Sequence, residues 1–124
     1  MNLLFTGESP EKIINRTKTM TARCWLIRPP REGQHIYAQT GRANSTRFAK
    51  LLITKVTKWD GRDPATAGYT NNHIVAKKEG FNSYLEFIAA YRSLNGERLT
   101  DPRRTNYFIE FEVIEILNNA QNAL

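Results

Sequence analysis

The sequence contains few of the residues that form cross-links or metal sites. Cys24 is the only cysteine, which excludes an internal disulfide and any multi-cysteine metal site. The two histidines, His35 and His73, lie too far apart in sequence to suggest a zinc site. Because free cysteines usually pack as small apolar residues, Cys24 is predicted to be buried rather than catalytic. We therefore expect a protein that works without a metal or other cofactor.

Long apolar runs are also missing. The longest, such as Phe87-Ile88-Ala89-Ala90, fall far short of the roughly 20 residues that a membrane-spanning helix needs. Residues 1–5 lack the basic start and apolar stretch of a signal peptide. The 124 residues, 40% of them hydrophobic and 24% charged, predict one globular domain at 1–117 and a C-terminal tail at 118–124. We expect a cytoplasmic protein without membrane contact, either monomeric or homodimeric.

Acidic residues are scarce in the first half of the chain. Residues 1–62 carry 12 Lys/Arg against 4 Asp/Glu, a net charge of +8, whereas residues 63–124 carry 6 against 8, a net charge of −2. Between Lys12 and Lys58 the only acidic residue is Glu32. Phosphate backbones bind such a surface because counterions are released, so RNA is a candidate partner. Solubility alone explains the same charge equally well.

Strand patterns dominate the chain, and helical patterns occur at only a few points. Strands are predicted at 3–5, 17–26, 35–40, 48–59 and 109–117, where β-branched and aromatic residues gather. A short helix is predicted after Ser9, which can cap it, with Pro10 in its first turn. A second helix is predicted at 71–78, and 63–68 is expected to be a loop. This order favours an α+β fold in which a small mixed-sheet barrel has helices packed outside it.

The clearest helix follows Ser83-x-x-Glu86, a capping box. Its predicted apolar face is formed by five side chains at helical spacing, Tyr84, Phe87, Ile88, Tyr91 and Leu94. In the last strand the alternation breaks at Ile114, which predicts a β-bulge or a contact with a second surface. The apolar residues 114–117 therefore leave a structural or partner-binding role open.

Signatures of the common enzyme classes are absent, including phosphate-binding loops, dinucleotide fingerprints, metalloprotease helices and nucleophile elbows. One candidate is residues 18–23, Lys-Thr-Met-Thr-Ala-Arg. In a regular strand Lys18 and Thr21 lie on opposite faces, but a twisted first step brings them together. A desolvated lysine can then accept the proton of a threonine hydroxyl. A Thr-rich strand edge with a solvated lysine is the alternative.

A second candidate is Glu79, directly before Gly80. Glycine can take a left-handed turn between two helices, so the carboxylate can point into a cleft. Otherwise Glu79 is an ordinary acidic residue in a last helical turn, where the helix dipole slightly disfavours it.

A third candidate is the segment 40–47, where Arg42 and Arg47 accompany a glycine and several hydroxyls. Such a loop can bind phosphate or a base edge, or it can be only a solvated hairpin. Trp25 and Trp59 either stack on bases or belong to the core or its rim.

The order of these segments resembles the ASCH domain, a member of the PUA-like group. The resemblance covers nearly the whole chain and depends on the order and spacing of several motifs, namely residues 3–6, 18–23, the strand led by Gly33, 40–42, 79–83 and 107–111. It implies a PUA-like β-barrel and a link to RNA. Some family members hydrolyse the amide of N4-acetylcytidine, and ribonuclease activity has also been described in the family.

The resemblance also implies roles for individual residues. Lys18 and Thr21 match the lysine and threonine of the amidohydrolase members, and Glu79 matches their glutamate. By this resemblance Thr21 attacks the amide carbonyl, Lys18 takes its proton, and Glu79 orients the pair or the substrate. Arg23 fixes the substrate or a phosphate. Many members have a glycine at the position of Arg16.

Two functions follow. The first is an RNA- or nucleotide-binding module that uses Arg23, Arg42 and Arg47. The second is an amidohydrolase that acts on acylated cytidine or a similar modified nucleoside. A binding module needs an extended basic surface, whereas the enzyme needs an enclosed cleft with a perturbed lysine.

Overall fold

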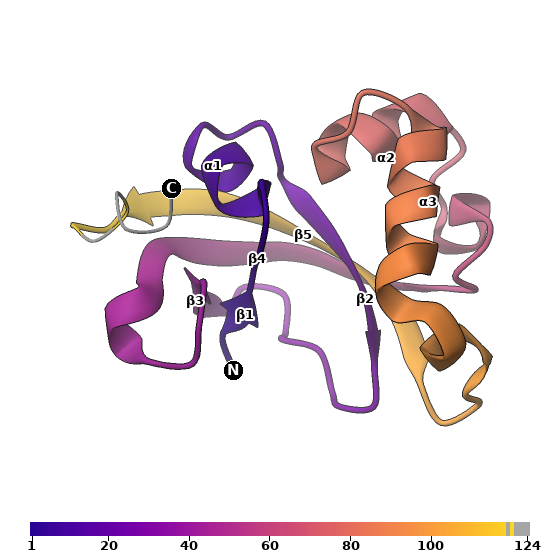
Figure 1. Ribbon diagram of the computed structural model, residues 1–124, viewed down its shortest axis with the longest axis horizontal. Coiled ribbons are helices and arrows are strands. Elements are labelled where there is room, and N and C mark those ends of the chain that lie inside the picture. The colour runs from indigo at the N-terminus through magenta and orange to yellow at the C-terminus, as the bar shows by residue number, and fades with distance from the viewer. Residues whose placement is uncertain (119, 121–124) are drawn as a thin grey trace.

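The described part of the chain folds into one five-stranded sheet and three α-helices (Figure 1). The computed structural model describes residues 1–118 and 120, so most of the predicted tail at 118–124 lies outside the described residues. No helix in this part of the chain is long and apolar enough to cross a bilayer. The elements are β1 (Leu3–Leu4), α1 (Ser9–Ile14), β2 (Met20–Trp25), β3 (His35–Gln39), β4 (Arg47–Trp59), α2 (Asn72–Glu79), α3 (Tyr84–Asn95) and β5 (Thr105–Ile116).

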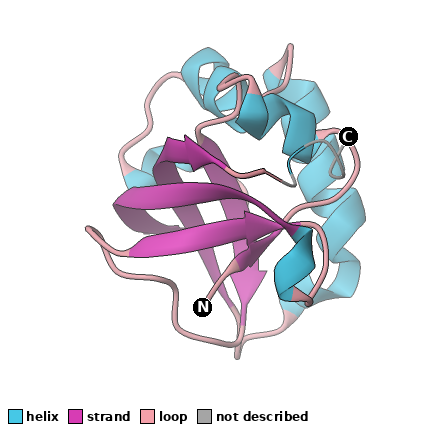
Figure 2. Ribbon diagram, turned by 90° about the vertical axis from the view of Figure 1, so that its left-hand side faces the viewer, coloured by secondary structure: helices cyan, strands magenta, loops and turns pink. Residues whose placement is uncertain are grey.

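The sheet is mixed and curled. Its strand order is β1-β3-β4-β5-β2, with β1 parallel to β3 and the other neighbours antiparallel. Figure 2 shows the sheet wrapping into a half-barrel with helices around it. Arg23 Nη2 on the edge strand β2 donates to the carbonyl of Leu4 on the opposite edge strand, at 2.7 Å, and so links the two edges. This architecture confirms the predicted α+β fold with a barrel-like sheet and external helices.

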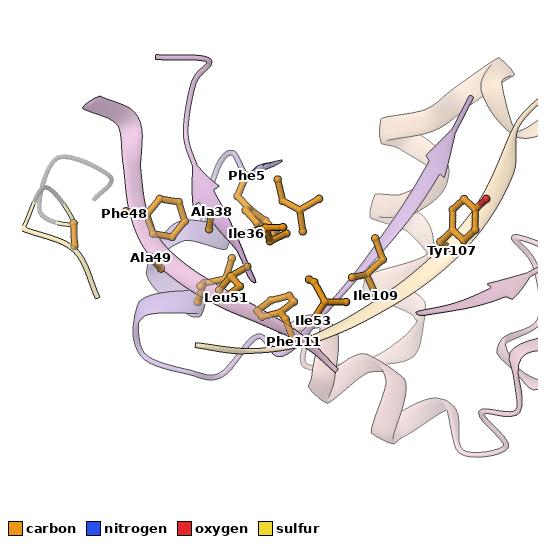
Figure 3. Packing of buried hydrophobic residues seen from close by; sticks show 13 residues of the cluster. Phe5, Ile36, Ala38, Phe48, Ala49, Leu51, Ile53, Tyr107, Ile109 and Phe111 are labelled. Atoms are coloured by element: carbon orange, nitrogen blue, oxygen red, sulfur yellow. The ribbon is translucent and has the colours of Figure 1, made fainter. Parts of the chain in front are cut away.

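One hydrophobic core fills the inside of the curl (Figure 3). Phe5 makes edge-on ring contacts with Phe48 and Phe111, at centroid distances of 6.5 and 6.2 Å. Ile13 of α1 is fully buried in the same cluster. Complete burial of one such aliphatic or phenyl side chain contributes about 1.5–3 kcal/mol, so this cluster holds α1 on the sheet.

A second core lies between the other face of the sheet and the helices α2 and α3. Met20, Ala22 and Cys24 project into it from β2, and Phe108 projects from β5. Trp59 stacks on Phe108 with ring centroids 4.2 Å apart and is 5% exposed. Trp59 therefore belongs to the core and cannot stack on a base. The burial of Cys24 agrees with its expected role as an apolar side chain.

The predicted start of α3 is confirmed, since the Ser83 hydroxyl accepts from the backbone N–H of Glu86 at 3.2 Å. The predicted apolar face was wrong at its end, because Leu94 is 73% exposed. The last turn of α3 extends past the second core, and Leu94 lies at the edge of a pocket instead.

Two further local predictions were wrong. Ser9 is the first residue of α1 rather than its cap, because its N–H turns back to the Thr6 carbonyl and Glu8 takes the cap position without a side-chain bond. The segment 63–68, expected to be a loop, contains a 3-10 helix (Pro64–Ala67), which the Asp63 carboxylate caps through the N–H of Ala65.

The predicted bulge in the last strand is confirmed. Lys50 pairs with Glu115 and Leu51 pairs with Val113, which leaves Ile114 as the extra residue of β5. Val113 and Ile116 on either side of the bulge pack against the inner core, whereas Ile114 is 43% exposed.

Candidate active site

A pocket of about 480 Å³ lies along the free edge of β2. One wall comes from the segment between β1 and α1, and the other from the end of α2, from α3 and from the chain that follows α3. Because neighbouring residues of an edge strand point to opposite sides, the pocket receives side chains from both faces of β2. Lys18, Thr21, Arg23 and Glu79, four of the predicted site residues, line it together.

Lys18 reaches the pocket from a turn and not from a strand. Arg16 ends α1 with a left-handed φ of 64°, and the N–H groups of Thr17 and Lys18 both donate to the Lys12 carbonyl. The strand expected from residue 17 starts later, because β2 begins only at Met20. Lys18 therefore lies outside the strand, and the alternation of side chains along β2 does not place it on the face opposite Thr21. The Lys18 residue is 5% exposed.

Glu79 is the last residue of α2 and is 3% exposed. Its Oε1 accepts from the N–H of Ala22 at 2.7 Å, so the carboxylate satisfies a backbone donor on the open edge of β2. Its Oε2 lies 3.6 Å from Lys18 Nζ and has no hydrogen-bond partner among the described residues. Lys18 Nζ donates instead to the Glu79 carbonyl at 3.0 Å. A buried ion pair with one free carboxylate oxygen therefore lines the pocket.

Gly80 makes this arrangement possible in two ways. It ends α2 with a φ of 84°, in the left-handed region predicted from the sequence. A Cβ at this position would also lie 3.3 Å from the Cβ of Lys18. A residue with a side chain would therefore be strained here and would crowd Lys18.

Burial shifts the protonation equilibria of the pair. Desolvation lowers the pKa of Lys18 below its ordinary value, while the charge of Glu79 partly restores it. Desolvation raises the pKa of Glu79, and the charge of Lys18 opposes that rise. Both shifts favour neutral forms, so Lys18 loses its proton more readily here than in water.

Thr21 is 5% exposed and projects from β2 on the same face as Arg23. Its hydroxyl oxygen accepts from Arg23 Nε at 3.2 Å, which leaves the hydroxyl hydrogen available for donation. No hydrogen bond joins Thr21 to Lys18 in the described structure. Arg23 lies over the ring of Phe5, at 4.8 Å from its centroid, and desolvation lowers its pKa to about 10. It therefore stays charged at neutral pH.

Arg42 and Arg47, the other predicted nucleic-acid contacts, do not line this pocket. Arg42 is exposed between β3 and the short 3-10 turn Asn44–Thr46. Arg47 opens β4 and lies over the ring of Tyr37, with its guanidinium carbon 4.4 Å from the ring centroid.

Sequence reasoning missed two arginines that line the pocket, Arg98 and Arg104. Arg104 Nη1 donates to the Cys24 carbonyl on the free edge of β2, at 3.1 Å. No local motif marks these residues, because the approach of Arg104 to β2 depends on the long-range pairing of β5 with β2.

No group of three or more His, Cys, Asp or Glu side chains that could hold a metal ion occurs within residues 1–118 and 120. Desolvation raises the pKa of the Cys24 thiol. It therefore remains protonated and is a poor nucleophile.

No protein-family model matches the sequence, and no curated protein matches it. In three dimensions the chain is similar to the ASCH domain of Lactobacillus crispatus, with a TM-score of 0.63 and 13% identity over 90% of this chain and 77% of that one. It is also similar to the ZmASCH protein of Zymomonas mobilis, with a TM-score of 0.56 and 16% identity over 98% of this chain and 73% of that one.

A third similar structure is an Enterococcus faecalis protein of the family model DUF984, with a TM-score of 0.62 and 18% identity over 94% of this chain and 82% of that one. At these identities the comparisons establish the fold, which is ASCH-like.

Proposed function

We propose that the pocket along β2 is the active site of an amidohydrolase that removes the acyl group of N4-acetylcytidine or a similar modified nucleoside. The observation that carries this proposal is the buried Lys18–Glu79 pair on the wall of a pocket that Thr21 also lines. A lysine with a lowered pKa that lines the same pocket as a threonine hydroxyl can serve as the base for that hydroxyl as nucleophile.

In the proposed reaction the Thr21 oxygen bonds to the acyl carbon while its proton passes to Lys18 Nζ. The bond between the acyl carbon and the exocyclic nitrogen then breaks, and Lys18 returns the proton to that nitrogen, which releases cytidine. Water next attacks the acyl ester on Thr21, again with Lys18 as the base. The bond between the acyl carbon and the Thr21 oxygen breaks, Lys18 returns the proton to that oxygen, and acetate leaves. Lys18 must turn from the Glu79 carbonyl toward Thr21 when substrate binds, since the two do not hydrogen bond in the free protein.

Glu79 has two tasks in this proposal. Its negative charge partly offsets the lowering of the Lys18 pKa by burial, so that Lys18 can both accept and return a proton. Its unpartnered Oε2 is a hydrogen-bond acceptor inside the pocket, which suits the N–H of the substrate amide.

The size and walls of the pocket suit a nucleoside. Pockets for small ligands usually measure about 300–1,000 Å³, and this one measures about 480 Å³. Trp25, Phe81 and Tyr91 line it and supply aromatic surface against which a planar base can pack. A concave pocket that contains a buried lysine with a lowered pKa favours the enzyme over a module that only binds RNA.

RNA binding is a second candidate, favoured by the basic first half. Of the 12 Lys/Arg side chains in residues 1–62, only Lys12 and Lys18 pair with an acidic residue in the described structure. Exposed members of this group, such as Arg28, Arg31 and Arg42, are available to a phosphate backbone.

The direct experiment is to incubate the purified protein with N4-acetylcytidine and to follow cytidine and acetate by chromatography. The proposal predicts equal amounts of both products, formed in proportion to enzyme concentration. Absence of cytidine release at millimolar substrate rejects N4-acetylcytidine as the substrate.

A further inference from the structure

The charges that line the pocket are unequal. Lys18, Arg23, Arg98 and Arg104 supply four positive side chains, and Glu79 supplies one negative side chain. Lys18 and Glu79 pair with each other, and Arg23 is occupied by Thr21 and Leu4. The hydrogen bonds of Arg23 are thus filled by neutral acceptors, Arg104 has only a long contact of 3.8 Å with an acidic side chain, that of Asp101, and Arg98 forms no ion pair with a described residue. The pocket therefore carries surplus positive charge, and Arg98 and Arg104 are the residues best placed to offer it to a ligand.

Arg104 lies farther along β2 than the Lys18–Glu79 pair, and the backbone carbonyl of Arg98 lies near Cys24 of the same strand, at 3.6 Å from its Sγ. Glu79 binds β2 through the N–H of Ala22, and Arg104 binds the same strand through the carbonyl of Cys24. In an extended strand the Cα atoms of Ala22 and Cys24 lie about 7 Å apart. The pocket thus has an acyl-transfer end and a cationic end, set apart along one rigid edge.

The two arginines are prepared for a ligand in different ways. Arg104 is fixed by its bond to β2, and its contact with Asp101 is a long 3.8 Å. Asp101 is already held by two hydrogen bonds from Arg103, at 3.0 and 2.9 Å. The Arg98 side chain is exposed and makes no hydrogen bond or ion pair with any described residue. Arginine donors in such a position suit the oxygens of a phosphate.

We infer that the pocket takes a phosphorylated nucleoside, a nucleoside 5′-monophosphate, with Arg98 and Arg104 as its phosphate subsite. This inference rests on the proposal that the pocket binds a nucleoside. A nucleotide carries its base and its phosphate at opposite ends, which matches the two ends of the pocket. Arg98 and Arg104 then bind the phosphate and place the base beside Lys18 and Thr21.

The test is isothermal titration calorimetry at low salt with cytidine and with cytidine 5′-monophosphate. The wild type is expected to bind the monophosphate at least about tenfold more tightly, the effect of one charge-assisted hydrogen bond. Arg98→Ala is expected to reduce this advantage to less than about threefold. Arg92→Ala removes an exposed arginine of α3 that does not line the pocket, and it should keep the full advantage.

Equal affinity for cytidine and its monophosphate, or an advantage that survives Arg98→Ala, overturns the inference. A cytidine-containing hexaribonucleotide that binds far more tightly than the monophosphate also overturns it, because the arginines then serve an RNA chain. The hydrolysis assay separates the two proposals. If the protein cleaves the acyl amide but does not prefer the phosphorylated compound, the amidohydrolase proposal stands and the phosphate subsite is rejected. If it binds the phosphorylated compound preferentially but cleaves no amide, the subsite stands and the amidohydrolase proposal is rejected.

Discussion

Arg16 shows how one residue controls the approach to the site. It is the one non-glycine residue with a positive φ in the described part of the chain, and it turns the end of α1 toward Lys18. An L-residue with a side chain pays about 1–2 kcal/mol for this conformation. The glycine that many ASCH members carry here fits the turn without that strain, and this structural reason was not accessible from the sequence alone.

We predict that Arg16→Gly keeps the turn and raises the free energy of unfolding by about 0.5–1 kcal/mol. The relief of left-handed strain outweighs the added freedom of glycine in the unfolded chain. Urea denaturation measures the change. Arg28→Gly, in an exposed loop without positive φ, is the control and should be neutral or destabilising. Loss of stability in Arg16→Gly would contradict the strain.

The protonation state of Lys18 determines how the proposed activity depends on pH. As a base, Lys18 must be neutral, so kcat/KM should rise with pH and level off above a pKa lower than 10.5. Glu79→Gln keeps an acceptor for Ala22 but removes the negative charge that raises the pKa of Lys18. The rising limb of its residual activity should therefore move to lower pH. A limb that stays in place or moves upward contradicts Lys18 as the base.

The residues of the site were predictable to different degrees. Lys18, Thr21 and Glu79 belong to short motifs that are visible in the sequence. Gly80 predicts the left-handed turn that follows Glu79. The pairing of Lys18 with Glu79 rather than with Thr21 was not predictable, because it depends on how α2 packs against β2. Their assignment as catalytic residues remains a prediction.

At the scale of elements, α2 holds Glu79 in place. Asn71 caps this helix, and its side-chain oxygen accepts from the N–H groups of His73 and Ile74, at 3.0 and 3.3 Å. The helix has eight residues, and short helices depend strongly on their ends and on tertiary packing. The cap therefore contributes to the position of Glu79 at the other end.

Removal of the Asn71 side chain tests how much this cap stabilises α2. Asn71→Ala should lower the free energy of unfolding by about 1 kcal/mol, because two backbone donors lose their partner. Asn72→Ala changes the same residue type one position later, where the side chain makes no hydrogen bond to a described residue, and should have little effect. Chemical denaturation monitored by circular dichroism compares the two. Equal stability of both variants would show that the cap contributes nothing.

Elements with strong local signals were predicted well. Ser83 marks α3, and the broken alternation at Ile114 marks the bulge of β5. The failures occurred where tertiary contacts override a local pattern. Ser9 joins α1 instead of capping it, and Leu94 continues the helical spacing of α3 after the core has ended.

At the scale of the whole molecule, the sheet order explains why the site is at β2. Both β1 and β2 are edges, and Arg23 joins them across the open side of the half-barrel. The N–H of Ala22 and the carbonyl of Cys24 bind side chains of the pocket, whereas in an interior strand such groups would pair with a neighbouring strand. Barrel-like closure was predictable from the strand patterns, but the identity of the edge strands was not, because it depends on pairings between distant segments.

The basic first half makes a prediction about RNA. If it binds RNA, log K should fall linearly with log salt, and Arg42→Glu should weaken binding and reduce the slope by about 1. Arg42 is exposed, so this change should not disturb the fold. Glu8→Lys is a control that adds positive charge at an exposed position. Filter binding across a salt series measures the RNA affinity of the wild type and the variants. An affinity that does not change with salt would exclude RNA as a partner.

The most direct measurement compares cytidine release from N4-acetylcytidine by the wild type, Thr21→Val and Thr19→Val. Valine preserves the shape of threonine in a strand, and the Lys18–Glu79 pair stays intact. Thr19 does not line the pocket, so Thr19→Val controls for the same chemical change two residues away. We predict that Thr21→Val loses at least about 100-fold in kcat/KM while Thr19→Val retains wild-type activity. Wild-type activity in Thr21→Val would contradict the assignment of Thr21 as the nucleophile.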